Sequence, residues 1–323
     1  MPKVSIGLPV YNGQNFLAKT LEALLAQTEV DFEIVVSDNC SRDTTPQIVQ
    51  EFAAKDLRVK YFRTDRVLPP SENHTRTFKL SSGKYFKWAA HDDLHAPEFL
   101  ERCVGVLERD SSVVLVYPKV VVIDSHDRQL HEYKYKLRTD APNPSTRFGA
   151  LVNVNHRIHG AYEIYGLMRS DAVRAIPPEG NYPRGDSVFL TRMALLGRFH
   201  ELPQVLFYSR QHETRSVRQL PGQMKSGRAR LHKYIGTGPV PPLEWWDPSK
   251  KGVIDFPEWR IAKEYLLSIR DAPISTWEKF KCLLQMARWL IKKGFLKLIR
   301  DLLLATEQFV VRTPKITKPT PAQ

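Results

Sequence analysis

Two adjacent carboxylates, Asp92 and Asp93, follow an apolar and aromatic run over residues 85–90. The run is typical of a buried strand, and an amphipathic pattern typical of a helix begins after Pro97. The two acids therefore stand at the carboxyl end of a predicted strand. Like charges side by side are tolerable there if a cation usually sits between them or if solvent covers both. The pair suits a divalent metal, although Asp is also common where it only caps a turn or helix.

The elements that must position these acids alternate along the first 125 residues. Strand patterns occur at 4–10, 33–39, 59–62 and 85–90, followed by SVVLVY and KVVVID with Pro118 between them. Helical patterns of about ten residues separate the first four strands. This alternation predicts an α/β fold with βαβ units and a mainly parallel sheet that helices cover on both faces. Ligands of such sheets bind outside the carboxyl ends of the strands.

Three polar pairs fall at those predicted strand ends: Tyr11 with Asn12, Asp38 with Asn39, and Asp92 with Asp93. The chain has neither a GxGxxG motif after the first strand nor a GxxxxGK[ST] motif. Ordinary dehydrogenases and P-loop NTPases are therefore excluded. A nucleotide can still bind if Asp38 accepts from the imide of its base while Mg or Mn carries the phosphates, although Asp38 is equally typical of a turn.

Three ordered segments resemble the motifs of the family 2 glycosyltransferases: VSIGLPVYNGQNFLAKTLEALLAQT, EIVVSDNCSRDTTPQIVQEF and SSGKYFKWAAHDDLHAPEFLE. The resemblance is dense over residues 3–125 and thins out towards residue 216. It implies the nucleotide-sugar-binding GT-A fold, a nucleoside diphosphate sugar donor, and Mn or Mg as cofactor. It also implies a set of donor-binding residues: Pro9, Tyr11, Asn12, Asp38, Asn39 and Arg210.

The acidic motif departs from the family pattern, which is usually Asp-x-Asp. If Asp92 matches the second acid, Ala90 stands where the first would be. The resemblance then makes Asp92 the direct metal ligand, with Asp93 either supporting it at the metal or helping to orient the sugar. His212, in an Arg-x-His segment that follows a predicted strand, is implied as a further metal contact. A lone surface histidine is the alternative for His212.

Asp186 stands at the start of a predicted helix, after a loop marked by Gly180, Pro183 and Gly185. By resemblance it matches the catalytic base of the family, and a simple helix cap is the alternative. Attack of a hydroxyl on an anomeric carbon requires removal of the hydroxyl proton, which a nearby carboxylate can accept. One carboxylate acting opposite the leaving group implies a single displacement with inversion.

The composition of the chain limits its class. At 323 residues and 42% apolar content it can bury a large core. Three scattered cysteines favour reduced thiols over a disulfide framework or a zinc site. Neither a signal peptide nor a membrane-spanning run is found, so the sequence predicts a cytoplasmic chain, either free or peripheral on the inner face of the cell membrane.

The net charge of +13 is concentrated near the end of the chain. From Lys250 onward there are 15 Lys and Arg against 7 Asp and Glu, which accounts for +8. Within 277–300, basic residues alternate with aromatic and aliphatic ones, and Gly294 suggests a break between two amphipathic helices. Two interpretations stay open: the helices dock on an anionic membrane, or they pack on the catalytic domain with their charges solvated.

The predicted organisation has four parts. Residues 1–220 form the catalytic domain, with a nucleotide-sugar-binding part (1–125) and an acceptor-side part (126–220) in which 126–160 is a polar excursion near the acceptor. A Pro- and Gly-containing linker follows at 221–256. The basic helical tail covers 257–310, and 311–323 are predicted to be disordered.

The predicted activity is transfer of a sugar to a glycan or lipid-linked acceptor in bacterial envelope or exopolysaccharide assembly, and nucleic acid is not an expected partner. One rival is a sugar nucleotidyltransferase, which would carry a Gly-rich, basic N-terminal loop where this chain has GLPVYNGQ. A second rival is a non-catalytic basic protein that binds RNA or anionic lipid. The acidic clusters at the strand ends disfavour it.

Overall fold

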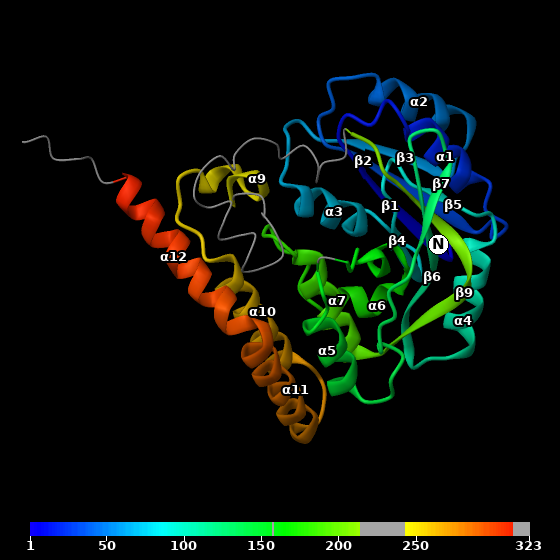
Figure 1. Ribbon diagram of the computed structural model, residues 1–323. Coiled ribbons are helices and arrows are strands. Elements are labelled where there is room, and N and C mark those ends of the chain that lie inside the picture. The colour runs from blue at the N-terminus through cyan, green and yellow to red at the C-terminus, as the bar shows by residue number, and fades with distance from the viewer. Residues whose placement is uncertain (157, 214–242, 313–323) are drawn as a thin grey trace, which may run out of the picture.

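A nine-stranded mixed sheet forms the centre of the computed structural model, which describes residues 1–156, 158–213 and 243–312 (Figure 1). The strand order is β3-β2-β1-β4-β8-β6-β9-β5, and β7 pairs with β6 outside this path. The strands are β1 (Val4–Val10), β2 (Phe32–Asp38), β3 (Val59–Arg63), β4 (Tyr85–Trp88), β5 (Leu94–His95), β6 (Val113–Ile123), β7 (Gln129–Tyr133), β8 (Leu167–Arg169) and β9 (Arg198–Arg210).

Helices cover both faces of the sheet. The core on one face includes side chains of α1, α2 and α4, and the core on the other includes side chains of α3, α6 and α7. The helices are α1 (Leu17–Leu25), α2 (Thr45–Lys55), α3 (Pro70–Lys79), α4 (Phe99–Arg109), α5 (Pro144–Val152), α6 (Ser170–Arg174), α7 (Gly185–Leu196), α9 (Leu243–Trp246), α10 (Pro257–Asp271), α11 (Thr276–Trp289) and α12 (Phe295–Arg312), with short turns η1 (Tyr162–Tyr165), η2 (Pro248–Lys250) and η3 (Leu290–Gly294).

The strands β3, β2, β1 and β4 are parallel neighbours, as the alternating pattern predicts. All seven residues of β2 are buried, because helices cover both faces of this part of the sheet. Since the four strands run in one direction, their carboxyl ends lie at one edge. The loops after β1, β2 and β4 therefore meet there, and these loops contain the three polar pairs.

The prediction of two strands separated by Pro118 was wrong, because β6 runs unbroken from Val113 to Ile123. Pro118 is tolerated for two reasons. On one side, β8 pairs with residues 115–116 and β7 with 120–123, so the proline falls in the gap between them. On the other side, the register with β9 shifts between Pro118 and Lys119, which accommodates the missing N–H.

The predicted excursion over 126–160 is partly core. The strand β7 forms an antiparallel pair with β6, and α5 packs against α7 and α11. Phe148 and Val152 of α5 are buried. The sequence pattern did not show this because the apolar residues of α5 face two helices that come much later in the chain.

The C-terminal helices pack on the catalytic domain. A third core cluster joins Phe148 of α5 and Val188 of α7 to Tyr265 of α10 and Met286 of α11. In this packing Gly149 of α5 touches Gln285, where a methyl group would come within 2.6 Å of the side-chain amide. Packing on the catalytic domain, one of the two interpretations of the tail, accounts for the apolar residues on this buried face of the helices.

The helix continues through Gly294, where a break was predicted. Residues Leu290–Gly294 form a π turn, so α11 and α12 make one long helix that runs alongside α10 (Figure 1). A side chain at Gly294 would come within 2.5 Å of the Trp289 ring, which explains the glycine. Among the described helices, none is long and apolar enough to cross a membrane.

Residues 221–242 of the predicted linker lie outside the described residues. The rest of the linker, 243–256, contains α9 and η2. The predicted disorder of 311–323 also falls outside them from 313 onward.

Candidate active site

The loops after β1 and β2 are tied together at the sheet edge. Asn12 adopts a left-handed backbone with φ 52°, a conformation that Asn tolerates better than most residues. Its N–H donates to Ser41 Oγ at 2.9 Å, and its Oδ1 accepts from the Arg42 N–H at 2.9 Å. The preceding Tyr11 ring is 45% exposed, whereas Pro9 is half-buried inside β1. Of these predicted donor contacts, Tyr11 is the most accessible.

Asp38 and Asn39 lie beneath the surface and organise the neighbouring loops. One Asp38 carboxylate oxygen accepts from the Ser41 N–H and the other from the Tyr61 hydroxyl, both at 2.8 Å. The Asn39 amide bonds both the N–H and the carbonyl of Leu68, at 2.7 and 2.9 Å. The predicted donor contacts of these two residues stay predictions. What the structure shows is that they fix the loops around that edge of the sheet.

The pair Asp92–Asp93 meets the Arg210-x-His212 segment, as the predicted roles require. His212 Nε2 lies 2.8 Å from Asp92 Oδ2, and the backbone N–H of Arg210 donates to Asp93 Oδ1 at 2.7 Å. The antiparallel pairing of β5 with β9 brings these segments together across 118 positions of sequence. Residues 92, 93, 210 and 212 therefore form one cluster, which we call the acid cluster.

Within the acid cluster, Arg210 supports the loop that carries the two aspartates. Its side chain is fully buried, with Nε donating to the Asp92 carbonyl at 2.7 Å and Nη1 to the Asp124 carbonyl at 3.0 Å. It also pairs with Asp127 and lies over the Phe16 ring. These contacts show that the enclosed guanidinium positions the two acids. The predicted contact of Arg210 with the donor stays a prediction.

The acid cluster provides few metal ligands. In the part of the chain that the structure describes, no group of three or more His, Cys, Asp or Glu side chains could hold a metal ion. Asp92 and His212 supply one carboxylate and one imidazole. Such a pair fits a Mg or Mn ion that takes most of its remaining ligands from water and a diphosphate.

Asp186 is the second residue of α7, and it is partly accessible although surrounded by protein. Its Oδ1 accepts from the Ser187 N–H at 2.7 Å, so it also serves as a local cap. Burial, followed by the nearby Glu179 carboxylate, raises the pKa of Asp186 to about 6. A carboxylate with such a pKa is a stronger proton acceptor than an ordinary aspartate.

The loop that precedes Asp186 is held by the C-terminal helices. Arg184, in a left-handed backbone conformation with φ 64°, pairs with Glu258 at the start of α10 at 2.5 Å. Glu258 is buried and also faces Lys297 at 3.8 Å and Arg300 at 3.2 Å, both from α12. Burial alone would raise the pKa of Glu258, but the surrounding cations hold it below its usual value.

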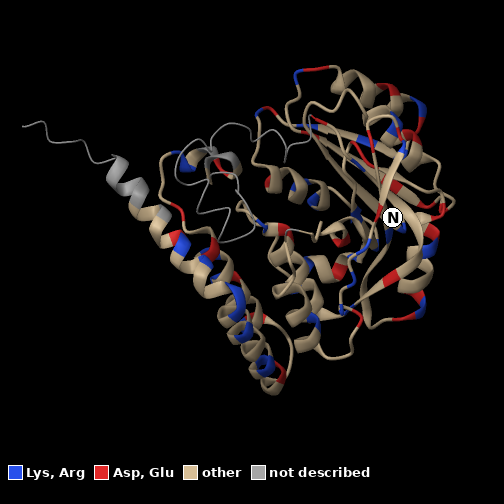
Figure 2. Ribbon diagram, viewed as in Figure 1, with Lys and Arg blue, Asp and Glu red and all other residues tan. Residues whose placement is uncertain are grey.

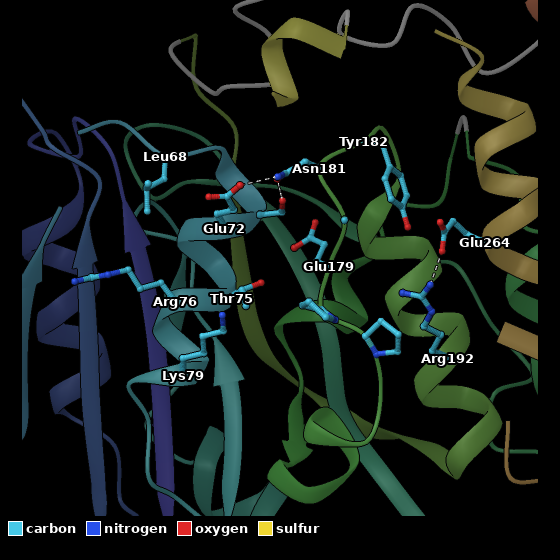
Figure 3. Close-up of a pocket in the computed structure, with 14 residues that line it drawn as sticks. Leu68, Glu72, Thr75, Arg76, Lys79, Glu179, Asn181, Tyr182, Arg192 and Glu264 are labelled. Carbon is cyan, nitrogen blue, oxygen red and sulfur yellow. Dashed lines mark hydrogen bonds and ion pairs between the residues drawn. The ribbon is translucent and has the colours of Figure 1, made fainter. Parts of the chain in front are cut away.

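A cavity of about 650 Å³ lies between α3 and the loop 177–182 (Figure 3). Glu72 of α3 and Asn181 of the loop line it, and their side chains are 3.1 Å apart. Arg76 also lines it and donates to Ser37 Oγ of β2 at 2.7 Å. The cavity therefore extends from the loop before Asp186 towards the end of β2.

Sequence reasoning missed the residues of this cavity and the ion pairs behind Asp186. Charged residues at 72, 76 and 79 have helical spacing, and such a pattern ordinarily indicates a face in contact with solvent. Glu258 is 74 positions away from Arg184 and carries no local signal.

Comparisons with known proteins show which family the chain resembles. The family model described as "Glycosyl transferase family 2" matches residues 5–176, which is more than half of the chain. An uncharacterized glycosyltransferase of Rickettsia typhi is 32% identical over 134 residues, 41% of each chain. A chondroitin synthase of Escherichia coli is 32% identical over 117 residues, 36% of this chain and 17% of that one. The chain matches about two fifths of the length of the first curated relatives.

A solved fragment of S. aureus TarS, residues 1–349 in complex with UDP-GlcNAc, covers 95% of this chain and 92% of its own length. Its TM-score is 0.53 at 16% identity. A likeness at this identity concerns the fold. It confirms the predicted α/β fold of GT-A type with C-terminal helices.

Proposed function

The chain belongs to glycosyl transferase family 2, and on that premise we propose that it transfers a sugar from a nucleoside diphosphate sugar to an acceptor hydroxyl with inversion. The observation that carries the proposal is the acid cluster. Asp92, Asp93 and His212 converge at the carboxyl end of β4, and the buried Arg210 holds them in place. In a parallel sheet this edge is where ligands bind.

The acid cluster is proposed to hold the diphosphate end of the donor. Asp92 and His212 would bind Mn or Mg, and Asp93 would keep the loop in place through its bond with the Arg210 N–H. A bound divalent ion offsets the charge that grows on the departing nucleoside diphosphate. Tyr11 and Asn12, at the adjacent strand end, are proposed to contact the nucleotide.

Asp186 is proposed to accept the proton of the acceptor hydroxyl. Its pKa of about 6 leaves most of it ionised at neutral pH while making it a better proton acceptor than a free aspartate. Attack by the deprotonating hydroxyl on the face opposite the leaving group forms one bond as the other breaks. The product therefore has the inverted anomeric configuration.

The cavity beside α3 is proposed to receive the acceptor. It ends at the loop before Asp186, and its walls offer the Glu72 carboxylate and the Asn181 amide, which suit sugar hydroxyls. We propose a glycan or lipid-linked acceptor in envelope or exopolysaccharide assembly. The similarity to a chondroitin synthase supports a polysaccharide product.

A donor screen tests the proposal directly. Thermal unfolding is measured with UDP, GDP, dTDP and CDP sugars, beginning with UDP-GlcNAc, with and without Mn. A donor that binds the folded chain raises its melting temperature by mass action. A donor concentration 100 times Kd adds about 2.7 kcal/mol to the free energy of unfolding. Release of nucleoside diphosphate from the stabilising donor, with and without a glycan acceptor, then measures transfer. No stabilisation by any donor would contradict the proposal.

Asp92→Asn is the matched variant for this screen. It keeps the size of the side chain but removes the charge that a metal needs. Donor affinity should fall in Mn and stay the same in its absence, because only the metal-dependent part is lost. If parent and variant bind the donor equally well in saturating Mn, Asp92 is not a metal ligand.

A further inference from the structure

The long helix formed by α11, the π turn and α12 has two faces of different character. One face packs on the protein, where Cys282, Met286 and Trp289 are buried in the core cluster shared with α5, α7 and α10. Further along the same side, Lys297 and Arg300 are buried against Glu258. This face is accounted for by contacts within the chain.

The opposite face is apolar and open. Its large side chains recur at helical spacing with exposed fractions that reach 65% at Trp277 and 82% at Ile291. The rings of Trp277 and Phe280 stack with centroids 5.4 Å apart. We call this the apolar stripe, and it consists of Trp277, Phe280, Leu283, Leu284, Ile291, Phe295, Leu296, Leu302 and Leu303. Scattered exposed leucines are ordinary, but a contiguous stripe of this length indicates an interaction surface.

The charges beside the apolar stripe are of one sign. Arg288 and Lys292 are exposed, and neither forms an ion pair with any residue that the structure describes. Glu278 pairs with Lys281, and Asp301 is buried, so no unpaired carboxylate lies beside the stripe between residues 276 and 303. Figure 2 shows the basic positions along this helix.

We propose that the apolar stripe lies on the surface of an anionic lipid bilayer, with Trp277, Phe280, Ile291 and Phe295 entering the interface. Arg288 and Lys292 would contact the lipid phosphates. The charge pattern favours this occupant over a second copy of the chain, because a second copy would bring the same cations to the same stripe. An amphipathic helix with aromatic and aliphatic residues on one side and basic residues at its border is suited to such an interface.

Docking of the apolar stripe on lipid does not depend on the proposed transfer reaction. The way the long helix packs on the protein also suits docking on a membrane surface. Because the other face is held by the catalytic domain, the helix can offer only one side to lipid and would lie along the surface. Each cation near an anionic membrane strengthens binding about fivefold at low salt, and added salt weakens the effect.

Vesicle co-sedimentation of the full chain tests the proposal. The vesicles are phosphatidylcholine alone or phosphatidylcholine with phosphatidylglycerol, at low and high salt. Binding is expected with the anionic vesicles at low salt and should fall as salt rises. Ile291→Ser with Phe295→Ser should weaken binding on the order of tenfold or more. Arg288→Gln with Lys292→Gln should weaken it roughly 25-fold for the anionic vesicles only.

Leu57→Ser is the matched control, since Leu57 is 93% exposed and lies on another part of the chain. All four replaced positions in the test variants are exposed, so the variants should keep the parent's melting temperature and its donor-induced stabilisation. Failure of the full chain to bind anionic vesicles at low salt would overturn the proposal. So would self-association in sedimentation velocity that the stripe variant abolishes, because a second copy would then cover the stripe.

Discussion

Asp186 combines an elevated pKa with partial access to solvent, and these two properties determine how the activity should depend on pH. The proposed base works only when ionised, so kcat/KM should decline as pH falls through about 6 rather than near 4. In Asp186→Asn, turnover should drop roughly 100-fold or more, and the decline of kcat/KM around pH 6 should disappear. Donor affinity should be unchanged. The pH profile of parent and variant checks this. Near-normal turnover would reduce Asp186 to a helix cap.

The same residue makes a prediction about stability. Its folded-state pKa lies above the value of about 3.9 in an unfolded chain. The stability that its protonated form contributes is therefore present below pH 4 and is lost as pH rises through about 6. The amide in Asp186→Asn stays neutral at every pH, so the variant does not lose this stability as pH rises. Above pH 7 it should therefore melt at the same temperature as the parent or higher. A marked drop in melting temperature would show that the carboxylate is structurally required.

At the scale of elements, Glu258 joins α10 and α12 to the loop that carries Asp186. Glu258→Gln would leave Arg184, Lys297 and Arg300 facing a neutral group in a buried position. Breaking a buried ion pair in this way costs about 3–5 kcal/mol. Because Arg184 is two residues from Asp186, turnover should fall as well. The pH at which kcat/KM declines should shift, while donor affinity is retained. Denaturant unfolding and steady-state kinetics measure the two effects.

Glu278→Gln is the control for this prediction. Glu278 also ties the C-terminal helices to the body of the protein, since it accepts from the Ser145 N–H at 2.9 Å and pairs with Lys281. It is less buried than Glu258 and contacts α5 instead of the base loop. Its loss should therefore lower stability by about 1 kcal/mol and leave turnover unchanged. Equal losses of turnover in both variants would contradict a specific role for Glu258.

At the scale of the whole molecule, the C-terminal helices and the catalytic domain share one core. Phe148, Val152, Val188 and Leu195 are buried under α10 and α11. Truncation after residue 256 would expose all four and uncover Arg184. The truncated chain is therefore expected to aggregate or to lose its cooperative transition, whereas the full chain should unfold in a single step. Calorimetry of both distinguishes these outcomes, and a truncated chain that melts cooperatively near the parent's temperature would contradict the prediction.

Periodicity was sufficient to predict the alternating strands and helices of residues 4–109, because each of these elements has a clear apolar face of its own. It was also sufficient to place Asp92 after the carboxyl end of β4, since the carboxyl ends of parallel strands lie at one edge of the sheet. It failed where partners are distant. Pro118 was expected to end a strand because its two flanking partners, β8 and β7, could not be foreseen. In the tail, composition alone did not separate the packed face from the open one.

The π turn at Leu290–Gly294 sets the rotational phase between the two halves of the long helix. A residue in an α-helix advances by about 100° around the axis, and a π turn takes up one residue more than an α turn. If Leu290–Gly294 were α-helical instead, α12 would be rotated by about that angle against α11. Lys297 and Arg300 would then leave Glu258, and Phe295 would leave the line of Trp277 and Ile291. The π turn therefore keeps two unrelated surfaces aligned on one helix. Gly294, which leaves room for the Trp289 ring inside this turn, matters to both surfaces.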